Sequence, residues 1–335
     1  MTWLELYGRA LAADEAAAGY YNRNVGLPSP NGKVNVRIPL EAADVMDVRL
    51  WREEDVLARI RPYVARVPEL RHVSEDPPFQ VHHFIEGRVL DSFSPRGAPV
   101  PDNVLSDVVT LMDQLVRIPQ EMAPDVPDHW PASGDSSGFG HLLASLTRDV
   151  HATYRQEYRE AFAELGIPAD PLAVVEPRWD SLTSRPFAVL HADLHRKNMI
   201  VTDGATWFLD WELALWGDPM YEIGIHFHKM DYPEEQRDAV FKRWRDLLPA
   251  RFTAGPVNDL DLYMAHERIK SAIVDTVRYS KQLAAAARPE REFLMGRLAK
   301  KVNAARELWG LSRDLSPERV ADALAPWREG WSWTS

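Results

Sequence analysis

The stretch His191-Ala192-Asp193-Leu194-His195-Arg196-Lys197-Asn198 decides the fold, together with Phe208-Leu209-Asp210-Trp211-Glu212. Between them lie two apolar runs joined through Asp203-Gly204, a pattern typical of a short β-hairpin. Such a hairpin turns the chain back, so Asn198 and Asp210 face one cation while Asp193 lies in front of it. A base and two oxygen ligands for a hard divalent ion are groups that phosphoryl transfer requires. The pattern therefore predicts a phosphoryl-transfer site.

Two other interpretations of this stretch stay open at this point. The first is that Asp193 and Asn198 only cap a turn. The second is a zinc or dinuclear hydrolase centre, whose ligands would come from His191, Asp193, His195, His226 and His228. Residues 221–229 read as a helix, however, and positions 226 and 228 of a helix point to different sides. This geometry is poor for a shared metal ion.

The composition limits the class of protein and its partners. The chain has 335 residues, 45% of them hydrophobic, and no apolar run long enough to span a membrane. The first residues lack the apolar core of a signal peptide, so we expect a cytoplasmic protein with no membrane partner. The absence of cysteine excludes disulfides and thiol catalysis. A net charge of −11 argues against a nucleic-acid partner, which needs a basic face.

The first hundred residues predict a small β-rich lobe. We expect strands within 16–28 and over 33–39, an amphipathic helix over 52–60, and a strand over 79–85 that ends at Glu86-Gly87. Beyond a proline-rich loop helices dominate, and the strand 187–190 leads into the catalytic stretch. Residues 122–137 read as a surface loop. The expected helices lie near 103–118, 138–165, 218–230, 233–247, 258–286, 289–308 and 316–327.

Several segments resemble those of one known family, the aminoglycoside phosphotransferases, with choline kinase and related small-molecule kinases of the protein-kinase-like fold. The match extends along most of the chain, and its segments are Arg52–Leu57, Val81–Gly87, His191–Asn198, Phe208–Glu212 and Gly217–Glu222. The resemblance implies an α+β, two-lobed fold. Residues 1–87 would form a nucleotide-binding N-lobe, and residues 88–335 would form a larger, mostly helical C-lobe that holds the catalytic loop and the acceptor site.

The resemblance also implies which residues bind the nucleotide. They are Asn22, Arg23, Asn24, Arg37, Glu53, His83 and Phe84, the last two through their backbone groups. Arg37 stands where a phosphate-binding lysine is expected, with Lys33 as the alternative, and Glu54 is the alternative to Glu53 as its partner. Residues 20–24 stand where a nucleotide loop is expected, but they lack the glycine-rich pattern of protein kinases.

The remaining candidate residues divide by role. Asp193 is the expected base, and Asn198 and Asp210 are the expected ligands of Mg²⁺. His191 is expected to be a buried scaffold residue that hydrogen-bonds to backbone, and Asp218 before Pro219 predicts a helix N-cap. The possible substrate contacts are Glu212, His195, Glu267 and Asp275. Glu212 pairing with an arginine and His195 facing solvent are equal alternatives.

The implied activity is transfer of the γ-phosphoryl group of ATP or GTP to a hydroxyl of a small molecule. We expect an antibiotic acceptor (aminoglycoside, nucleoside or peptide) and a role in resistance or self-resistance. A metabolic acceptor such as a choline-, homoserine- or sugar-like molecule is the alternative, and a pseudokinase is a distant one. The acids near the cleft favour a cationic acceptor. Glu267 and Lys270, like Asp275 and Arg278, are spaced as ion pairs on a solvated face, which leaves a neutral pocket open.

Overall fold

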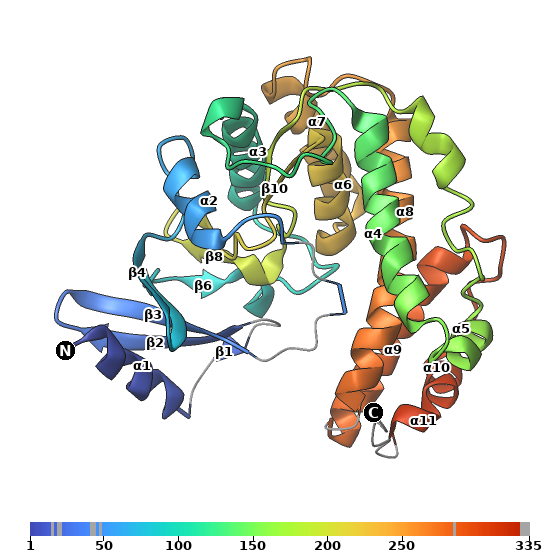
Figure 1. Cartoon of the computed structure of the whole chain (residues 1–335), viewed down its shortest axis with the longest axis horizontal. Helices are drawn as coiled ribbons and strands as arrows, with labels where there is room; N and C mark the ends of the chain where they lie inside the picture. Colours follow the sequence, from blue (N-terminus) through green and yellow to red (C-terminus); the bar gives the residue numbers. More distant parts are fainter. Residues whose placement is uncertain (15–16, 19–21, 41–44, 47–48, 284–285, 329–335) are drawn as a thin grey trace.

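The computed structural model of the chain describes residues 1–14, 17–18, 22–40, 45–46, 49–283 and 286–328. It has a small lobe built on an antiparallel sheet and a larger lobe built mainly of helices (Figure 1). The expected α+β, two-lobed architecture is therefore confirmed. No helix in the described ranges is both long and apolar enough to cross a membrane.

The sheet of the small lobe has the strand order β1-β2-β3-β5-β4. Its strands are β1 (Ala17–Ala18), β2 (Asn22–Ser29), β3 (Gly32–Pro39), β4 (Leu70–Glu75) and β5 (Pro78–His83). Two residues join β2 to β3, and Gly32 after them has a φ of +97°, which favours glycine. The expected strand over 79–85 is shorter than predicted, and residues 16 and 19–21 of the first predicted strand lie outside the described residues.

A helix that the sequence analysis did not predict, α1 (Trp3–Leu11), belongs to the small lobe. Its N-terminus has a capping box between Thr2 and Glu5, which satisfies two backbone N–H groups. Leu6 and Ala10 on one face join the core that the sheet forms with residues such as Val36. The helix therefore shields a sheet core that solvent would otherwise reach.

Helix α2 (Glu53–Ile60) has the buried face that its sequence predicts, with Val56, Leu57 and Ile60 at most 1% exposed. These side chains join the hydrophobic core of the large lobe and not that of the sheet. Trp51 Nε1, just before the helix, donates to the Asp125 carbonyl at 2.8 Å. The helix is thus anchored to the lobe that carries the catalytic stretch, although its sequence lies within 1–87.

The predicted hairpin is present. Strands β8 (Met199–Thr202) and β9 (Ala205–Phe208) pair across a two-residue Asp-Gly turn, and Gly204 has a φ of +85°. Strand β6 (Arg88–Val89) pairs with the other edge of β8. The strand that leads into the catalytic stretch is β7 (Ala188–Leu190), which pairs with β10 (Leu215–Gly217).

The large lobe contains helices near all the predicted positions. They are α3 (Asp102–Val116), α4 (Ser136–Tyr154), α5 (Arg159–Leu165), α6 (Pro219–Met230), α7 (Glu234–Leu247), α8 (Val257–Leu283), α9 (Arg288–Arg306), α10 (Pro317–Ala323) and α11 (Ala325–Arg328). The expectation of one helix over 138–165 is wrong, because a turn at 155–158 separates α4 from α5. That turn buries Tyr158, whose ring stacks on Trp327 at 4.5 Å and whose hydroxyl bonds Ser280 at 2.6 Å. The expected helix over 316–327 is likewise two short helices.

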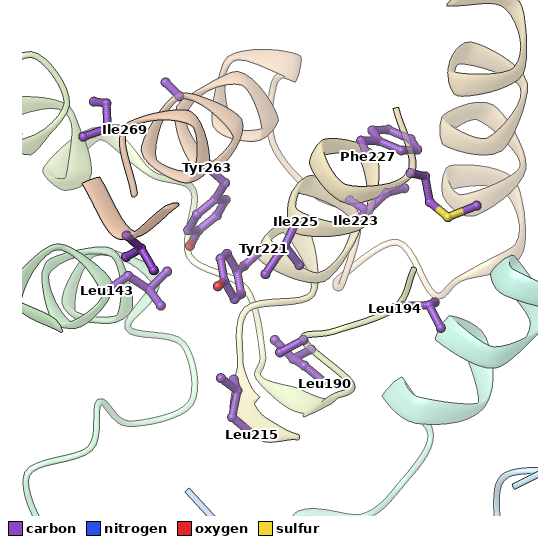
Figure 2. Close-up of a cluster of buried hydrophobic side chains, with 14 of the residues drawn as sticks. Leu143, Leu190, Leu194, Leu215, Tyr221, Ile223, Ile225, Phe227, Tyr263 and Ile269 are labelled. Atoms are coloured by element: carbon purple, nitrogen blue, oxygen red, sulfur yellow. The ribbon is translucent and has the colours of Figure 1, made fainter. Parts of the chain in front are cut away.

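The core beneath the catalytic stretch is formed by α6, α8 and α4 around β7 and β10 (Figure 2). Helix α6 is buried over most of its length, and it packs along α8. Tyr221 and Tyr263 meet edge to face between these two helices, with ring centroids 5.6 Å apart. This rigid support fixes the direction in which α6 presents its side chains to the catalytic loop.

A buried charge network fixes the starts of α6 and α8. The Arg185 guanidinium is 0% exposed, donates to both Asp218 carboxylate oxygens at 2.8 Å, and donates to Asp259 at 2.6 Å. Asp218 also caps α6 by accepting the Met220 N–H at 2.9 Å, with Pro219 as the first helical residue. The predicted N-cap at Asp218 is confirmed, and the arginine shows that the same carboxylate is part of the core.

Candidate active site

The catalytic loop follows β7 and is held by backbone contacts on two sides. Ala192 has a φ of +56°, and its N–H donates to Glu222 Oε2 on α6 at 2.9 Å. His191 is fully buried, and its Nε2 bonds the Leu209 carbonyl at 3.0 Å, just before Asp210. Burial lowers the pKa of His191 to about 4, so the ring is neutral. The imidazole therefore has the scaffold position that the sequence predicts, and not one suited to proton transfer.

Asp193 projects from this loop into the cavity and is surrounded by donors. Lys229 Nζ on α6 forms an ion pair with Oδ1, and the Asn198 amide donates to Oδ2 at 3.0 Å. His195 Nε2 lies 3.6 Å from Oδ2. Burial alone would raise the pKa of Asp193, but the Lys229 ammonium and His195 outweigh it and hold that pKa at about 2. The carboxylate is therefore ionised at neutral pH.

Lys229 is a site residue that the sequence analysis missed. It lies seven positions after Glu222 on α6, so both side chains leave the same face of the helix. Glu222 accepts the backbone N–H of Ala192, and Lys229 pairs with the next residue of the loop, Asp193. The i,i+7 spacing of an acid and a base was the available signal, but it identifies a pair only once the loop is known to cross this face.

Asn198 and Asp210 are brought together by the hairpin. The Leu209 N–H donates to the Asn198 carbonyl at 2.8 Å, which aligns the two ends of the hairpin. Asp210 has a φ of +65°, in the left-handed region that is sparsely populated outside glycine and is often found at functional sites. Asp193, Asn198 and Asp210 all line the same cavity.

Arg37 on β3 joins the small lobe to this hairpin. Its guanidinium contacts Glu53 at 2.9 Å, Asp210 at 2.5 Å and Glu212 at 3.0 Å. Glu53 also accepts the Trp211 N–H at 2.9 Å, so one buried carboxylate connects α2, β3 and the hairpin. The predicted pairing of Arg37 with Glu53 is present.

The alternatives to this pair lie elsewhere. Lys33 Nζ lies 3.7 Å from the centre of the Phe84 ring and 3.9 Å from Glu86, and its side chain is exposed. Glu54 pairs with Arg52 at 2.5 Å and accepts from Gln80 at 3.2 Å. Arg37 therefore occupies the position between the buried glutamate and the hairpin.

Carboxylates outnumber cations among the groups in contact around Arg37. Three carboxylates, from Glu53, Asp210 and Glu212, surround the single guanidinium of Arg37. Burial and the neighbouring Glu53 and Asp193 carboxylates raise the pKa of Asp210, against the opposing effect of Arg37. Burial and the Asp210 carboxylate raise the pKa of Glu212 to about 7. A further cation would relieve this repulsion, and oxygen donors are those that Mg²⁺ prefers.

The donor set fits Mg²⁺ better than zinc. The described residues contain no group of three or more His, Cys, Asp or Glu side chains placed to hold one metal ion. His226 bonds the Leu194 carbonyl and the Tyr232 hydroxyl, while His228 bonds Ser271 Oγ at 2.8 Å. The two imidazoles thus have separate partners, which argues against the hydrolase interpretation. Mg²⁺ often takes one or two protein oxygens and completes its shell with water and phosphate.

The other residues expected at the nucleotide are only partly in the cavity. Asn24 lines it and accepts from Asn35 at 3.1 Å, whereas Asn22 donates to Glu212 Oε2 at 3.2 Å. The expectation for Arg23 is wrong: its guanidinium bonds the Ala13 carbonyl and does not line the cavity. Neighbouring strand residues point to opposite faces, so Arg23 faces away from the side that Asn24 occupies.

Backbone contacts in the expected hinge are partly used by the sheet. The His83 N–H donates to the Glu69 carbonyl at 2.8 Å, and the Phe84 N–H donates to the Lys33 carbonyl at 3.3 Å. Both residues line the cavity, but neither amide is available as a donor to a base. Gly26 on β2, which sequence reasoning missed, lies so close that a Cβ there would be 2.7 Å from the Phe84 ring. A lone glycine inside a strand was the available signal.

The cavity has a volume of about 2190 Å³ and extends from β2 and β3 past the catalytic loop to α8 and α9. His195 lines it with a side chain that is 28% exposed. Glu267 and Asp275 also line it, so both are placed where an acceptor would bind. Glu212 contacts Arg37 and Asn22 and does not line the cavity, so of its two expected positions the pair with an arginine is the one present.

The two acids on α8 are not on a solvated face. Glu267 is 1% exposed and pairs with Lys270 at 2.6 Å. Asp275 is 5% exposed and pairs with Arg278 at 3.3 Å and with Lys301 of α9. The predicted ion pairs are present, but they are buried in the cavity wall. Because each carboxylate already has a cation beside it, these acids do not supply the negative field that we expected.

Comparisons with known proteins agree with this geometry. A family model described as the phosphotransferase enzyme family matches residues 13–255. A choline/ethanolamine kinase family protein from Mesorhizobium loti superposes with a TM-score of 0.57 at 16% identity, covering 98% of this chain and 100% of its own. Choline kinase LicA from Streptococcus pneumoniae has a TM-score of 0.57 at 13% identity, covering 91% of this chain and 98% of its own.

Aminoglycoside phosphotransferase APH(4)-Ia is similar to the same degree, with a TM-score of 0.57 at 17% identity, covering 90% of this chain and 97% of its own. A mutant of that enzyme in complex with AMP-PNP and hygromycin B has a TM-score of 0.54 at 14% identity, covering 87% and 94%. A search of curated proteins finds no match. The neighbours share the two-lobed kinase-like fold with this chain. Because the family model spans well over half of its residues, the chain belongs to the phosphotransferase enzyme family.

Proposed function

We propose that this protein transfers the γ-phosphoryl group of ATP or GTP to a hydroxyl of a small molecule, with Mg²⁺ as its metal. The observation that carries the proposal is the meeting of Asp193, Asn198 and Asp210 in one cavity, with the Arg37–Glu53 ion pair in contact with Asp210. A phosphoryl-transfer site needs a group that receives the hydroxyl proton and cations that offset the phosphate charge.

Each side chain has a role that its surroundings support. The ionised Asp193 would orient the attacking hydroxyl and accept its proton, and the Asn198 and Lys229 donors hold its carboxylate in place. Asn198 and Asp210 would hold Mg²⁺, which would supply positive charge at the nucleotide phosphates. Arg37, held by Glu53, would contact phosphate oxygens through the forked geometry of its guanidinium.

Two acceptor classes are compatible with these roles. We favour an antibiotic, with resistance or self-resistance as the role in the cytoplasm, since one structural neighbour is a phosphotransferase bound to hygromycin B. The alternative is a metabolic hydroxyl acceptor, because choline and ethanolamine kinases are equally similar in fold. A pseudokinase is disfavoured, because a pure binding module does not need Asp193, Asn198 and Asp210 together.

An assay that varies both the nucleotide and the acceptor tests the proposal. ATP and GTP are each incubated with Mg²⁺ and a panel of antibiotics and metabolites, and acceptor-dependent release of ADP or GDP is measured. In the Asp193→Ala variant, kcat for a confirmed acceptor should fall by about 10²- to 10⁴-fold with nearly unchanged nucleotide affinity, because the lost group acts on the hydroxyl. Turnover close to that of the wild type would reject Asp193 as the base.

A further inference from the structure

The acceptor end of the cavity is formed by one face each of α8 and α9. On α8 the residues at 271, 275, 278 and 282 follow an i, i+4, i+7, i+11 pattern, and all line the cavity. On α9 the lining residues Leu294, Arg297 and Lys301 are spaced three and four apart. These two helices pack side by side, so the two faces together form a continuous wall.

Cations outnumber carboxylates along this wall. Within the described residues, the basic side chains that line it from α8 and α9 are Lys270, Arg278, Arg297 and Lys301. The acidic side chains that line it from the same helices are Glu267, Asp275 and Glu290. Arg96 and Lys229 also line the cavity, but they already pair with Asp231, at 3.5 Å, and with Asp193, so they add nothing to the excess. The excess is therefore positive, opposite in sign to that around Arg37.

The buried acids do not reverse this balance. Asp275 is shared between Arg278 and Lys301, so one negative charge is set against two positive charges. The neighbouring His228 adds no charge to this wall. Burial lowers its pKa to about 3; Glu267 opposes this shift, and Lys301, Arg96 and Lys270 add to it. The ring is therefore neutral and leaves the positive excess to the lysines and arginines.

Arg297 is the cation in this wall best placed to bind a ligand. In the parts of the chain that the structure describes, no carboxylate lies within salt-bridge distance of its guanidinium. The guanidinium carbon lies 5.5 Å from the centre of the Phe293 ring and 5.9 Å from that of Tyr279. These rings support the side chain without neutralising it. Lys301, one turn later on the same face, adds a second positive charge.

From this arrangement, and resting on the phosphotransferase function above, we propose that the acceptor carries an acidic group that binds at Arg297 and Lys301. The group is a carboxylate or a phosphate, because both match the forked donors of a guanidinium. The hydroxyl that receives the phosphoryl group lies on the same molecule, toward Asp193. A polycationic or quaternary ammonium acceptor would place its charge against the basic wall.

Four hexose probes of similar size separate the charge classes: glucose, glucosamine, glucuronate and glucose 6-phosphate. Their binding to the full-length protein saturated with Mg²⁺ and AMP-PNP is measured by isothermal titration calorimetry. We expect glucuronate or glucose 6-phosphate to bind at least tenfold more tightly than glucose, and glucosamine no more tightly than glucose. The stronger of the two acids identifies the acidic group. The absence of any preference for the acids, or tightest binding of glucosamine, overturns the proposal.

Variants locate the preference. Arg297→Gln should reduce the preference for the acidic probe over glucose at least tenfold. Arg297→Lys should restore part of this preference, because lysine has the positive charge but lacks the paired N–H donors of a guanidinium. Lys300→Gln removes one charge from the exposed side of the same helix and should leave the preference unchanged. An equal loss in Lys300→Gln, or none in Arg297→Gln, contradicts the assignment. If the protein fails to bind Mg²⁺ and AMP-PNP, the proposed function fails, whereas the same titrations without nucleotide still test Arg297.

Discussion

Replacing Glu222 by glutamine should make the protein more stable at neutral pH relative to the wild type, and the gain should disappear in acid. Glu222 is 2% exposed, and its Oε2 accepts the Ala192 N–H at 2.9 Å. Burial raises the pKa of Glu222 from 4.5 to about 7, although the Ala192 N–H and the Lys229 ammonium lower it. Glutamine keeps an oxygen that can accept the same N–H, but it cannot ionise.

The sign and size of the effect follow from the two pKa values. Below pH 4.5 the carboxyl is protonated in both the folded and the unfolded chain, so its ionisation contributes nothing to stability. Between pH 4.5 and 7 only the unfolded chain ionises, which favours unfolding, and above pH 7 the penalty is constant. A shift of this size corresponds to about 3 kcal/mol.

Urea denaturation at pH 4.5, 6 and 8 measures the free energy of unfolding of both proteins. The difference between Glu222→Gln and wild type should increase by about 3 kcal/mol from pH 4.5 to 8. Effects of the substitution that do not depend on pH cancel in this comparison. Glu292→Gln, at an exposed carboxylate on α9, is the matched control and should show no such increase. A difference that stays flat with pH for Glu222→Gln would refute the reasoning.

Three further outcomes follow from the site and its supports. Asp210→Ala should abolish the Mg²⁺-dependent part of turnover, and a Mg²⁺ titration identical to that of the wild type would reject Asp210 as a ligand. Arg185→Met should lower the free energy of unfolding by about 3–5 kcal/mol, because two buried carboxylates lose their cation. Urea denaturation at pH 7.5 measures this loss, and a loss of less than about 1 kcal/mol would contradict the prediction. Gly26→Ala should raise KM for the nucleotide several-fold with little change in kcat, because its Cβ would clash with Phe84. Steady-state kinetics measures both constants, and an unchanged KM would show that Gly26 does not affect nucleotide binding.

The parts of the structure that were predictable from sequence are those with local signals. The Asp203-Gly204 turn specifies the hairpin, and an Asp before a Pro specifies the start of α6. The spacing of Asp193, Asn198 and Asp210 then follows, because the hairpin fixes the path between them. The face of α2 was predictable for the same reason, since helical periodicity places Val56, Leu57 and Ile60 together.

The errors arise where distant segments decide the outcome. The break between α4 and α5 depends on contacts of Tyr158 with Ser280 and Trp327, far away in the sequence. The assignment of Arg23 failed because the face of a strand depends on its register, and a shift of one residue exchanges the faces. Lys229 and Arg185 act through pairs that span 36 and 33 residues, so no local pattern identifies them.

The burial of Glu267 and Asp275 had the greatest consequence for function. The spacing of each with a base three residues later describes a solvated helix face and a buried ion pair equally well. In the structure helix α9 packs against α8 and contributes Lys301 to Asp275, so this carboxylate is balanced by buried cations and does not supply the expected negative field.

The distribution of charge along the cavity connects the two halves of the proposed reaction. Around Arg37, three carboxylates meet one guanidinium, and the pKa values of Asp210 and Glu212 are raised as a result. At the α8–α9 end, cations outnumber carboxylates. A bound divalent cation would correct the first imbalance, and an acidic group would correct the second. Asp193, ionised beside Lys229, lies on the loop between the two ends, where a hydroxyl held from the acceptor side would meet a phosphoryl group held from the other.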